Sequence, residues 1–269
     1  MAQTRSQSIP ARPSATIVLL RDFGRGPELL MVRRRAGDAF GDNHAFPGGV
    51  LDADESSARA FCRGVTADEA DAMLRVAEGG LDFYSAAIRE LFEETGMLLA
   101  RNRDGDWATD SPGLQELREK VDQTTLAWPV FLGEQELLMA CDALHYFAHW
   151  ETPLDRPKRW STRFFIAEAP SAQDASHDGS ELTDVRWMTA AEALSSAREG
   201  DMKLPFPTIK TLAMLAEFNT VDSLLDWART RARDGVDRIR PVALLEDGVA
   251  RFVIPGDPDY PNDDDIVLN

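Results

Sequence analysis

The sequence predicts an α/β fold. Two apolar, β-branched runs near the start are typical of strands, a segment in the middle has the periodicity of an amphipathic helix, and both patterns recur towards the end. With 269 residues, of which 43% are hydrophobic, the chain is long enough to bury a large core. We therefore expect helices that pack on a β-sheet.

Two strands and a loop are expected in the first part of the chain. Residues 14–21 (SATIVLLR) and 28–34 (ELLMVRR) are separated by GRGP, which predicts a hairpin. The glycine- and aspartate-rich segment 39–55 predicts a loop that needs unusual backbone angles at Gly48 and Gly49. Loops of this kind often approach ligands.

Helices are expected next. Residues 56–80 have helical composition, and we expect an inserted pair of short helices that ends at Gly79-Gly80. The segment 82–100 has apolar residues at helical spacing, with Asp82 as a candidate N-cap and Gly96 as a stop signal. This is the strongest helix pattern in the sequence.

The remaining patterns predict further helices and strands. Helices are expected over 114–123, 134–147, 189–199, 207–218 and 221–233, and strands over 162–168 and 184–188. One or two more strands follow, before a Pro/Asp-rich end that we expect to be extended.

Charge and composition exclude several function classes. The formal net charge of −17 is unfavourable for binding a nucleic-acid backbone, although residues 1–35 carry +5 and could contact a small polyanion. The two cysteines do not form a CxxC pair, so neither a disulfide framework nor a thiolate zinc site is indicated. The sequence has no run of about 18 apolar residues and no secretory signal, so we expect no membrane partner and a cytoplasmic location.

Three glutamates on the 82–100 helix are the strongest chemical signal. Glu90, Glu93 and Glu94 have i, i+3 and i+4 spacing, so at about 100° per residue they lie on one face of the helix. Like charges at this spacing destabilise a helix, and Arg89 alone cannot balance them. A divalent cation would remove the conflict, and oxygen ligands favour Mg²⁺ or Mn²⁺ over zinc. Taken alone, the cluster could also be an ordinary solvated helix face.

The residues around the glutamates match a known signature. Residues 89–96, RELFEETG, followed by Met97, resemble the core of the Nudix box, REUxEExGU, in which U is apolar. The opening half of the box, Gx₅E, matches Gly49 to Glu55, directly after Phe-Pro-Gly. The usual box has seven residues between its halves, whereas here residues 56–88 provide 33, an insertion of 26. The chain thus resembles the Nudix hydrolase superfamily, with one departure from its pattern.

Within that superfamily, the chain resembles the peroxisomal-type coenzyme A diphosphatases, which also carry an insertion in the box. Residues 29–55 and 152–170 look like the matching segments of that branch. The resemblance implies an α/β/α sandwich around a mixed β-sheet, with a helical insertion. We expect a flexible leader over 1–13, a Nudix domain over 14–250 with an insertion at about 56–80, and a Pro/Asp-rich tail over 251–269.

The resemblance also implies roles for individual residues. The expected metal ligands are Glu90, Glu94, Glu93 and the backbone carbonyl of Gly48, with Glu181 as a further candidate. The expected catalytic residues are Glu93, Glu90, Arg89 and Glu55. Here Arg89 pairs with Glu55, and the identity of the base stays open. The expected substrate-binding residues are Arg33, Arg34, Arg35, Phe46, Gly49 and Arg163, for which ordinary packing or surface pairing is the alternative.

Three functions follow from these expectations. The leading hypothesis is Mg²⁺- or Mn²⁺-dependent cleavage of the diphosphate of coenzyme A or acyl-coenzyme A, a substrate that the resemblance implies. The same chemistry could act on ADP-ribose or on a dinucleotide such as NADH. A different class is a catalytically silent nucleotide-binding Nudix module, although such domains commonly lose a box glutamate and this chain keeps all three. The expected partner is a small nucleotide, and a homodimer contact is left open.

His145 and His149 form a further candidate pair. Their i, i+4 spacing could bind a metal, but no carboxylate is interleaved as in HExxH. We therefore expect packing and hydrogen bonding for this pair.

Overall fold

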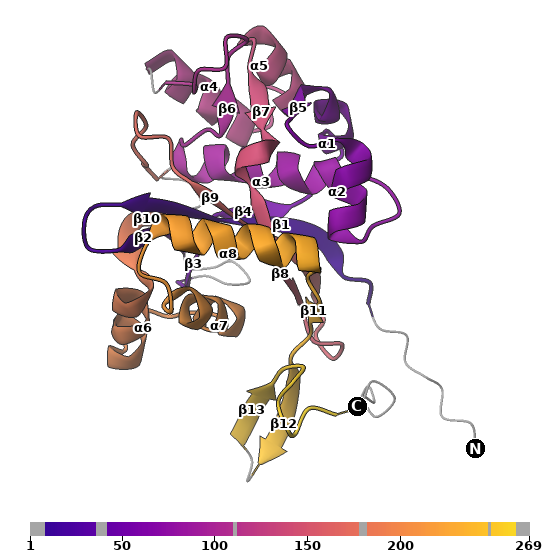
Figure 1. The fold of residues 1–269 in the computed structure, drawn as a ribbon, viewed down its shortest axis with the longest axis vertical. Helices are drawn as coiled ribbons and strands as arrows, with labels where there is room; N and C mark the ends of the chain where they lie inside the picture. Colours follow the sequence, from indigo (N-terminus) through magenta and orange to yellow (C-terminus); the bar gives the residue numbers. More distant parts are fainter. Residues whose placement is uncertain (1–8, 36–41, 110–111, 178–181, 247–248, 262–269) are drawn as a thin grey trace.

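A mixed β-sheet with helices on both faces forms the body of the protein (Figure 1). The computed structural model describes residues 9–35, 42–109, 112–177, 182–246 and 249–261. The sheet strands are β1 (Arg12–Asp22), β2 (Pro27–Arg34), β3 (His44–Ala45), β4 (Gly48–Val50), β8 (His145–Glu151), β9 (Trp160–Glu168), β10 (Leu182–Thr189) and β11 (Arg238–Ile239). Their order is β10-β2-β1-β9-β8-β11, with β3 paired to β2 and β4 paired to β1. Because β1 is antiparallel to β2 and parallel to β9, the expected mixed sheet is confirmed.

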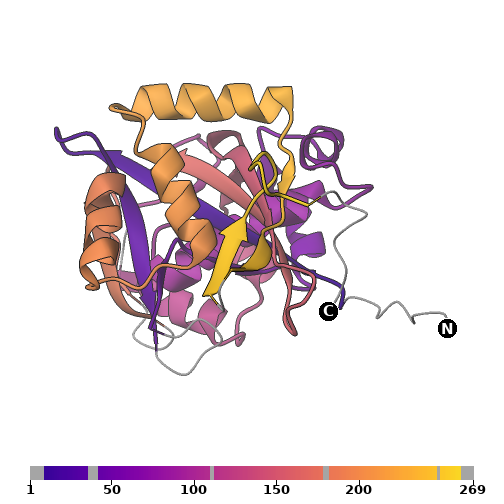
Figure 2. The same ribbon diagram turned by 90° about the horizontal axis from the view of Figure 1, so that it is seen from below.

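The helices lie on the two faces of this sheet, which gives the expected α/β/α sandwich (Figure 1). One face carries α1 (Glu55–Ala58), α2 (Ala67–Leu74), α3 (Gly80–Thr95), α4 (Pro112–Asp122) and α5 (Trp128–Glu134). The other face carries α6 (Ala190–Glu199), α7 (Phe206–Leu215) and α8 (Val221–Asp234). Figure 2 shows α8, in light orange, running along its side of the sheet.

Strand β1 explains why both faces need covering. Successive side chains of a strand point to opposite faces. Ile17 and Leu19 therefore pack in the core cluster under α3, while Val18 and Leu20 pack in the cluster under α6 to α8. The continuous apolar run of this strand is typical of a strand that is buried on both faces.

Helix α3 lies between the sheet and a smaller group of elements. It spans Gly80–Thr95, and nearly all of its residues are buried. On its outer side, the short strands β5 (Cys62–Arg63), β7 (Leu138–Ala140) and β6 (Ala100–Arg101) form a three-stranded sheet. The less buried positions on α3 are Asp82, Glu90 and Glu93, so two of the three box glutamates are slightly exposed.

The insertion forms two short helices, as expected, but its end differs from the prediction. After α1 come a 3₁₀ turn, η1 (Arg59–Phe61), and then α2, which ends at Leu74 with Arg75 in the left-handed region. Gly79-Gly80 does not end this helix; Gly79 caps α3 and Gly80 begins it. Asp82 consequently lies in the first turn of α3, where its carboxylate pairs with Arg59.

The end of α3 and the following segment correct two further expectations. The helix ends at Thr95, before Gly96, whose φ of 75° is favoured by glycine, so it is shorter than 82–100. The helix predicted over 134–147 is wrong. That segment holds the end of α5, strand β7, a 3₁₀ turn η2 (Cys141–Ala143) and the start of β8. The aromatic-rich sequence of β8 (HYFAHWE) packs on both faces of the sheet and favours a strand over a helix.

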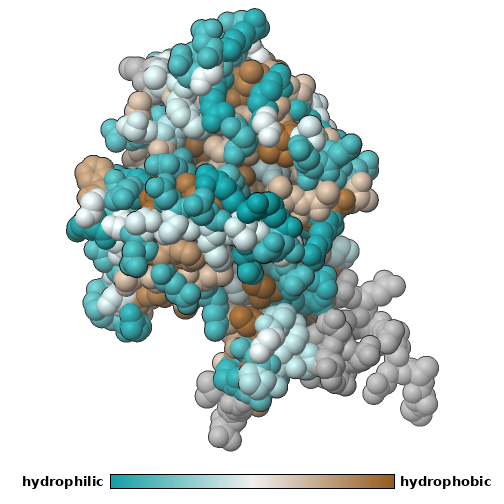
Figure 3. All heavy atoms as spheres, in the orientation of Figure 1, coloured by the Kyte–Doolittle hydropathy of each residue, from teal (hydrophilic) through white to brown (hydrophobic). Residues whose placement is uncertain are grey.

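The C-terminal part ends in a hairpin. Strands β12 (Val242–Glu246) and β13 (Val249–Val253) pair with each other and extend away from the body (Figure 1). The boundaries 14–250 and 251–269 stay predictions, although β1 begins at Arg12 and β13 continues to Val253. Polar residues cover most of the face drawn in Figure 3. Among the described residues, no helix is both long and apolar enough to span a membrane.

Candidate active site

The box glutamates lie where α3 faces β4 and the end of β2. Glu94 accepts a hydrogen bond from the backbone N–H of Gly48 at 3.0 Å and another from Arg34 Nη2 at 2.9 Å. The carboxylate of Glu90 lies directly against Gly49. The spacing of the box therefore brings two glutamates of the helix onto the two glycines of the loop.

Both glycines are required by their surroundings, for different reasons. Gly48 has a φ of 153°, and a Cβ there would meet the main chain of Ala15 and Thr16. The φ of Gly49 is one that other residues also adopt, but a Cβ there would meet the carboxylate of Glu90. The loop thus needs unusual backbone angles at Gly48, as expected, whereas Gly49 makes room for a side chain.

Arg89 is buried and contacts several carboxylates at once. Its Nε donates to Glu55 Oε1 at 2.8 Å and its Nη1 donates to Glu93 Oε2 at 2.6 Å. Its Nη2 donates to the Val50 carbonyl at 3.0 Å and lies 3.0 Å from Glu90 Oε1. The predicted pair of Arg89 and Glu55 is confirmed as a contact. Because these residues flank the insertion, its two ends meet and the glutamates keep their place beside the glycines.

We expect Arg89→Met to lower the free energy of unfolding by about 3–5 kcal/mol, because it leaves buried carboxylates without their counter-charge. Adding Glu55→Gln should recover part of this loss, since it removes one of the uncompensated charges. Chemical denaturation of the full chain measures both effects. Arg75→Met is the control, because its pair with Asp237 is exposed and should contribute less than about 1 kcal/mol. A loss in Arg89→Met no larger than in the control would contradict this role.

The carboxylates of the site are held where their charged forms are unfavourable. Burial raises the pKa of Glu55 and of Glu90, although Arg89 opposes both shifts. Burial also raises the pKa of Glu93 to about 8, with Arg89 opposing and Glu90 adding to the shift. Such a cluster is stabilised by any cation that binds close to it.

The donor atoms fit a hard divalent cation. Carboxylate oxygens of Glu90 and Glu94 and the carbonyl oxygen of Gly48 are the ligand type that Mg²⁺ and Mn²⁺ prefer. In the part of the chain that the structure describes, however, no three acidic, histidine or cysteine side chains converge as a ready-made metal cage. Instead, the Arg34 guanidinium lies between Gly48 O, at 2.7 Å, and Glu94 Oε1.

The three consecutive arginines differ in their surroundings. Arg34 points to the glutamates, whereas Arg33 pairs with Asp42, which also pairs with Lys203 at 2.8 Å. The two neighbours point to opposite faces because they follow one another on a strand. Arg35 is exposed just after the strand. Which arginine reaches a phosphate stays a prediction, and the geometry favours Arg34.

Two predicted substrate contacts are buried instead. Phe46 is only 3% exposed and packs in the core under α6 to α8, so its side chain does not line the site. The Arg163 guanidinium is buried, with Nη1 at 2.8 Å from both His149 Nε2 and Ser161 Oγ. It also lies over the Phe83 ring. Packing is therefore what these two side chains do in the structure, and Glu181 lies outside the described residues.

His145 and His149 lie on β8, so their spacing is that of a strand and not of a helix. Arg229 donates to His145 Nε2 at 3.2 Å, and the neutral ring of His149 accepts from Arg163. Hydrogen bonding is therefore what this pair does in the structure, as the sequence favoured.

His149 predicts a loss of stability in acid. Burial, followed by the charge of Arg163, lowers the pKa of His149 from 6.5 to about 3. Between these two values the unfolded chain binds a proton that the folded chain does not, so stability falls as the pH drops below about 6.5. In His149→Gln, the glutamine keeps an acceptor for Arg163 but does not titrate. We expect its free energy of unfolding to depend less steeply on pH, by up to about 1.4 kcal/mol per pH unit. Unfolding of both proteins between pH 7 and 5 tests this, and parallel slopes would contradict it.

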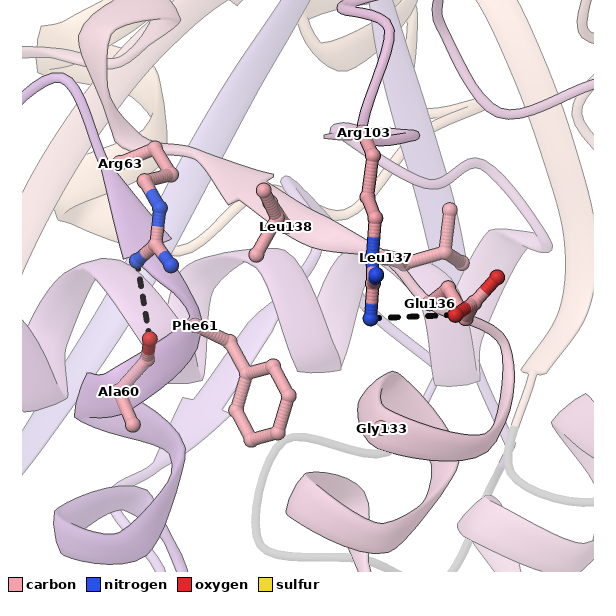
Figure 4. Close-up of a pocket in the computed structure, with 8 residues that line it drawn as sticks. All are labelled: Ala60, Phe61, Arg63, Arg103, Gly133, Glu136, Leu137 and Leu138. Carbon is pink, nitrogen blue, oxygen red and sulfur yellow. Dashed lines mark hydrogen bonds and ion pairs between the residues drawn. The ribbon is translucent and has the colours of Figure 1, made fainter.

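A cavity in the described part of the chain lies away from the box glutamates. It has a volume of about 420 Å³ and lies between the insertion and the 133–138 segment (Figure 4). Phe61 and Leu138 contribute apolar walls, and Arg103 pairs with Glu136 at its side. No box glutamate lines this cavity, so it is separate from the site that the sequence predicts.

Comparison with known proteins decides the family. A family model described as the NUDT19 Nudix domain matches residues 59–215, which include α3 and its glutamates. The chain belongs to the Nudix hydrolases. A crystal structure of a Nudix hydrolase from Alicyclobacillus acidocaldarius has 26% sequence identity and a TM-score of 0.70, and the match covers 81% of this chain and 96% of that one. The Nudix sandwich expected from the sequence is thereby confirmed.

Curated Nudix relatives carry a more specific name. Acyl-coenzyme A diphosphatase NUDT19 of Xenopus laevis is 30% identical over 195 residues, which cover 67% of this chain and 51% of the relative. The protein of the same name from Homo sapiens is 29% identical, over 70% of this chain and 53% of its own length. The chain thus spans about half the length of the curated relatives it matches. The chain therefore resembles acyl-coenzyme A diphosphatases, as the sequence predicted.

Proposed function

We propose that this Nudix protein hydrolyses the diphosphate bond of coenzyme A or of an acyl-coenzyme A, with Mg²⁺ or Mn²⁺ as its cation. The observation that carries the proposal is the meeting of Glu90 and Glu94 with the two loop glycines. Oxygen donors there form an acidic site beside a cationic arginine, which is the combination that a bound diphosphate and its cation need. The substrate class is inferred from the name of the matching relatives.

In this proposal, Glu90, Glu94 and the Gly48 carbonyl hold the cation. When bound, a divalent cation neutralises charge on the diphosphate oxygens and so favours attack on phosphorus. The cation contacts are made by groups whose positions β4 and α3 fix. Arg34, at the end of β2, is the proposed contact to a phosphate oxygen.

Glu93 is the proposed proton acceptor. Water attacks one phosphorus, the bond from that phosphorus to the bridging oxygen breaks, and a proton of the water passes to the carboxylate. The side chain of Glu93 lies one turn from Glu90, Arg89 holds its Oε2 at 2.6 Å, and Oε1 is the oxygen that we propose accepts the proton. Burial of this carboxylate raises its basicity, which suits a base that works near neutral pH.

Product analysis with a panel of substrates tests the proposal. Purified protein is incubated with coenzyme A, acetyl-coenzyme A, ADP-ribose and NADH, with Mg²⁺ or with excess EDTA, and the products are identified by mass. We expect 3′,5′-ADP and a 4′-phosphopantetheine product from the coenzyme A compounds, and none with EDTA. Cleavage of ADP-ribose or NADH alone would keep the site and reject the substrate. Absence of cleavage with every substrate would favour a silent nucleotide-binding module.

A further inference from the structure

An arginine side chain of the protein contacts two of the proposed metal ligands. Arg34 Nη2 is a single nitrogen that donates both to Gly48 O, at 2.7 Å, and to Glu94 Oε1, at 2.9 Å. These two oxygens are donors that the proposed function assigns to the divalent ion. Glu94 is almost fully buried, so its charge depends on groups that lie this close.

A guanidinium and a divalent ion cannot share these oxygens. Mg²⁺ binds oxygen at about 2.0–2.1 Å, so an ion bound to both atoms would occupy the space in which the nitrogen now lies. Repulsion between the two positive charges adds to the steric conflict. Binding of the ion therefore requires that Arg34 release Gly48 O and Glu94.

The chain allows this movement without moving the strand. The backbone of Arg34 is fixed on both sides, because its N–H donates to the Asn43 carbonyl at 3.0 Å and its carbonyl accepts from Asp42 N–H at 3.1 Å. The side chain, in contrast, is 23% exposed and ends a strand, so it can rotate about its own bonds. After release, the guanidinium stays within one side-chain length of the ion.

We propose that Arg34 is the counter-cation of Glu94 and Gly48 O, that a divalent ion displaces it, and that the displaced guanidinium then contacts the diphosphate held by that ion. This inference rests on the proposed function, since it assumes that Glu94 and Gly48 bind the ion. The arginine supplies the counter-charge of Glu94 until an ion binds. Ion and substrate binding are then coupled, because the diphosphate supplies the partner that Arg34 has lost.

Binding of Mn²⁺ alone tests the displacement, with electron paramagnetic resonance of free Mn²⁺ as a readout that does not require activity. We expect the Kd of Arg34→Gln to be about tenfold lower than that of the wild type, because the ion no longer breaks two charge-assisted hydrogen bonds. Arg33→Gln is the matched control, since it removes the same charge one residue away, from a side chain that pairs with Asp42 and not with Glu94. Its Kd should stay within about twofold of the wild type.

An Arg34→Gln variant that binds Mn²⁺ as the wild type does, or more weakly, overturns the inference. If that variant does not fold, Arg34→Met takes its place, and a Kd equal to that of the wild type has the same meaning, because methionine has neither the charge nor a hydrogen-bond donor. Coenzyme A hydrolysis by the same wild-type preparation separates the two proposals. Cleavage with unchanged Kd values removes the inference alone, whereas no Mn²⁺ binding and no cleavage removes the proposed function as well.

The second half of the inference is tested with substrate. At saturating Mn²⁺, Arg34→Gln should raise KM for coenzyme A about tenfold, since the diphosphate loses a charged contact. A purely structural role for Arg34 would instead lower the fraction of active enzyme and leave KM unchanged. Tighter Mn²⁺ binding together with an unchanged KM would overturn the contact with the diphosphate.

Discussion

Glu94→Gln is expected to lower kcat for diphosphate hydrolysis about a thousandfold, the largest effect that we predict for a single change. Glu94 is almost fully buried and is fixed by Gly48 N–H, so it is the most rigidly placed of the proposed cation ligands. Glutamine has the same shape but no charge, and its NH₂ group would face the guanidinium of Arg34. Cation binding should weaken for the same reason.

The fold should survive this change. The amide oxygen of glutamine can still accept from Gly48 N–H, and the loss of one ion pair should lower the free energy of unfolding by about 1–3 kcal/mol. Glu119→Gln is the control, because Glu119 is an exposed residue of α4. Initial rates and Mn²⁺ binding of the three proteins give the comparison. A Glu94→Gln protein that keeps more than about a tenth of the wild-type kcat would exclude Glu94 as a ligand.

The two adjacent glycines should respond in opposite ways to alanine. In Gly48→Ala, the new methyl group meets main-chain atoms at a φ of 153°, and we expect the free energy of unfolding to fall by about 2–4 kcal/mol. In Gly49→Ala, the methyl group meets the Glu90 carboxylate, which can swing away. Stability should then change little, whereas kcat/KM should fall about a hundredfold as Glu90 leaves its position.

Measuring both quantities on both variants makes this pair informative. Chemical denaturation gives the stability, and coenzyme A hydrolysis gives kcat/KM. Each glycine serves as the control for its neighbour, since the two changes add the same methyl group one residue apart. If Gly49→Ala proved as active as the wild type, Glu90 would not act from the position that the structure gives it.

Local patterns in the sequence were sufficient to predict the centre of the site. The helical period around Glu90 and the glycine-rich loop before it are both local signals, and the structure brings the two together. The contact of Arg89 with Glu55 was also predictable, because the two halves of the box must meet if the insertion closes on itself. An insertion of this size leaves the site intact because its ends are held by that buried pair.

Other features depended on contacts that no local pattern contains. Phe46 and Arg163 were predicted to face substrate, and their burial is decided by which strands and helices cover them. Arg33 and Arg34 are equivalent in sequence, and only the pairing of β2 with its neighbours decides which of them faces the glutamates. The first three residues of β8 were predicted as the end of a helix. The aromatic run of this strand fits a core strand, but only the fold shows that both of its faces are buried.

The central claim is that Glu90, Glu94 and the Gly48 carbonyl together form a divalent cation site on α3. Crystals of the protein grown with Mn²⁺ and a non-hydrolysable diphosphate, with anomalous scattering measured for manganese, test it most directly. We expect an anomalous peak in contact with Glu94 and Gly48 O, a further contact to Glu90, and the Arg34 guanidinium turned from these oxygens to the diphosphate. A manganese peak away from α3, or none at saturating Mn²⁺ with Arg34 still between Gly48 and Glu94, would contradict the claim.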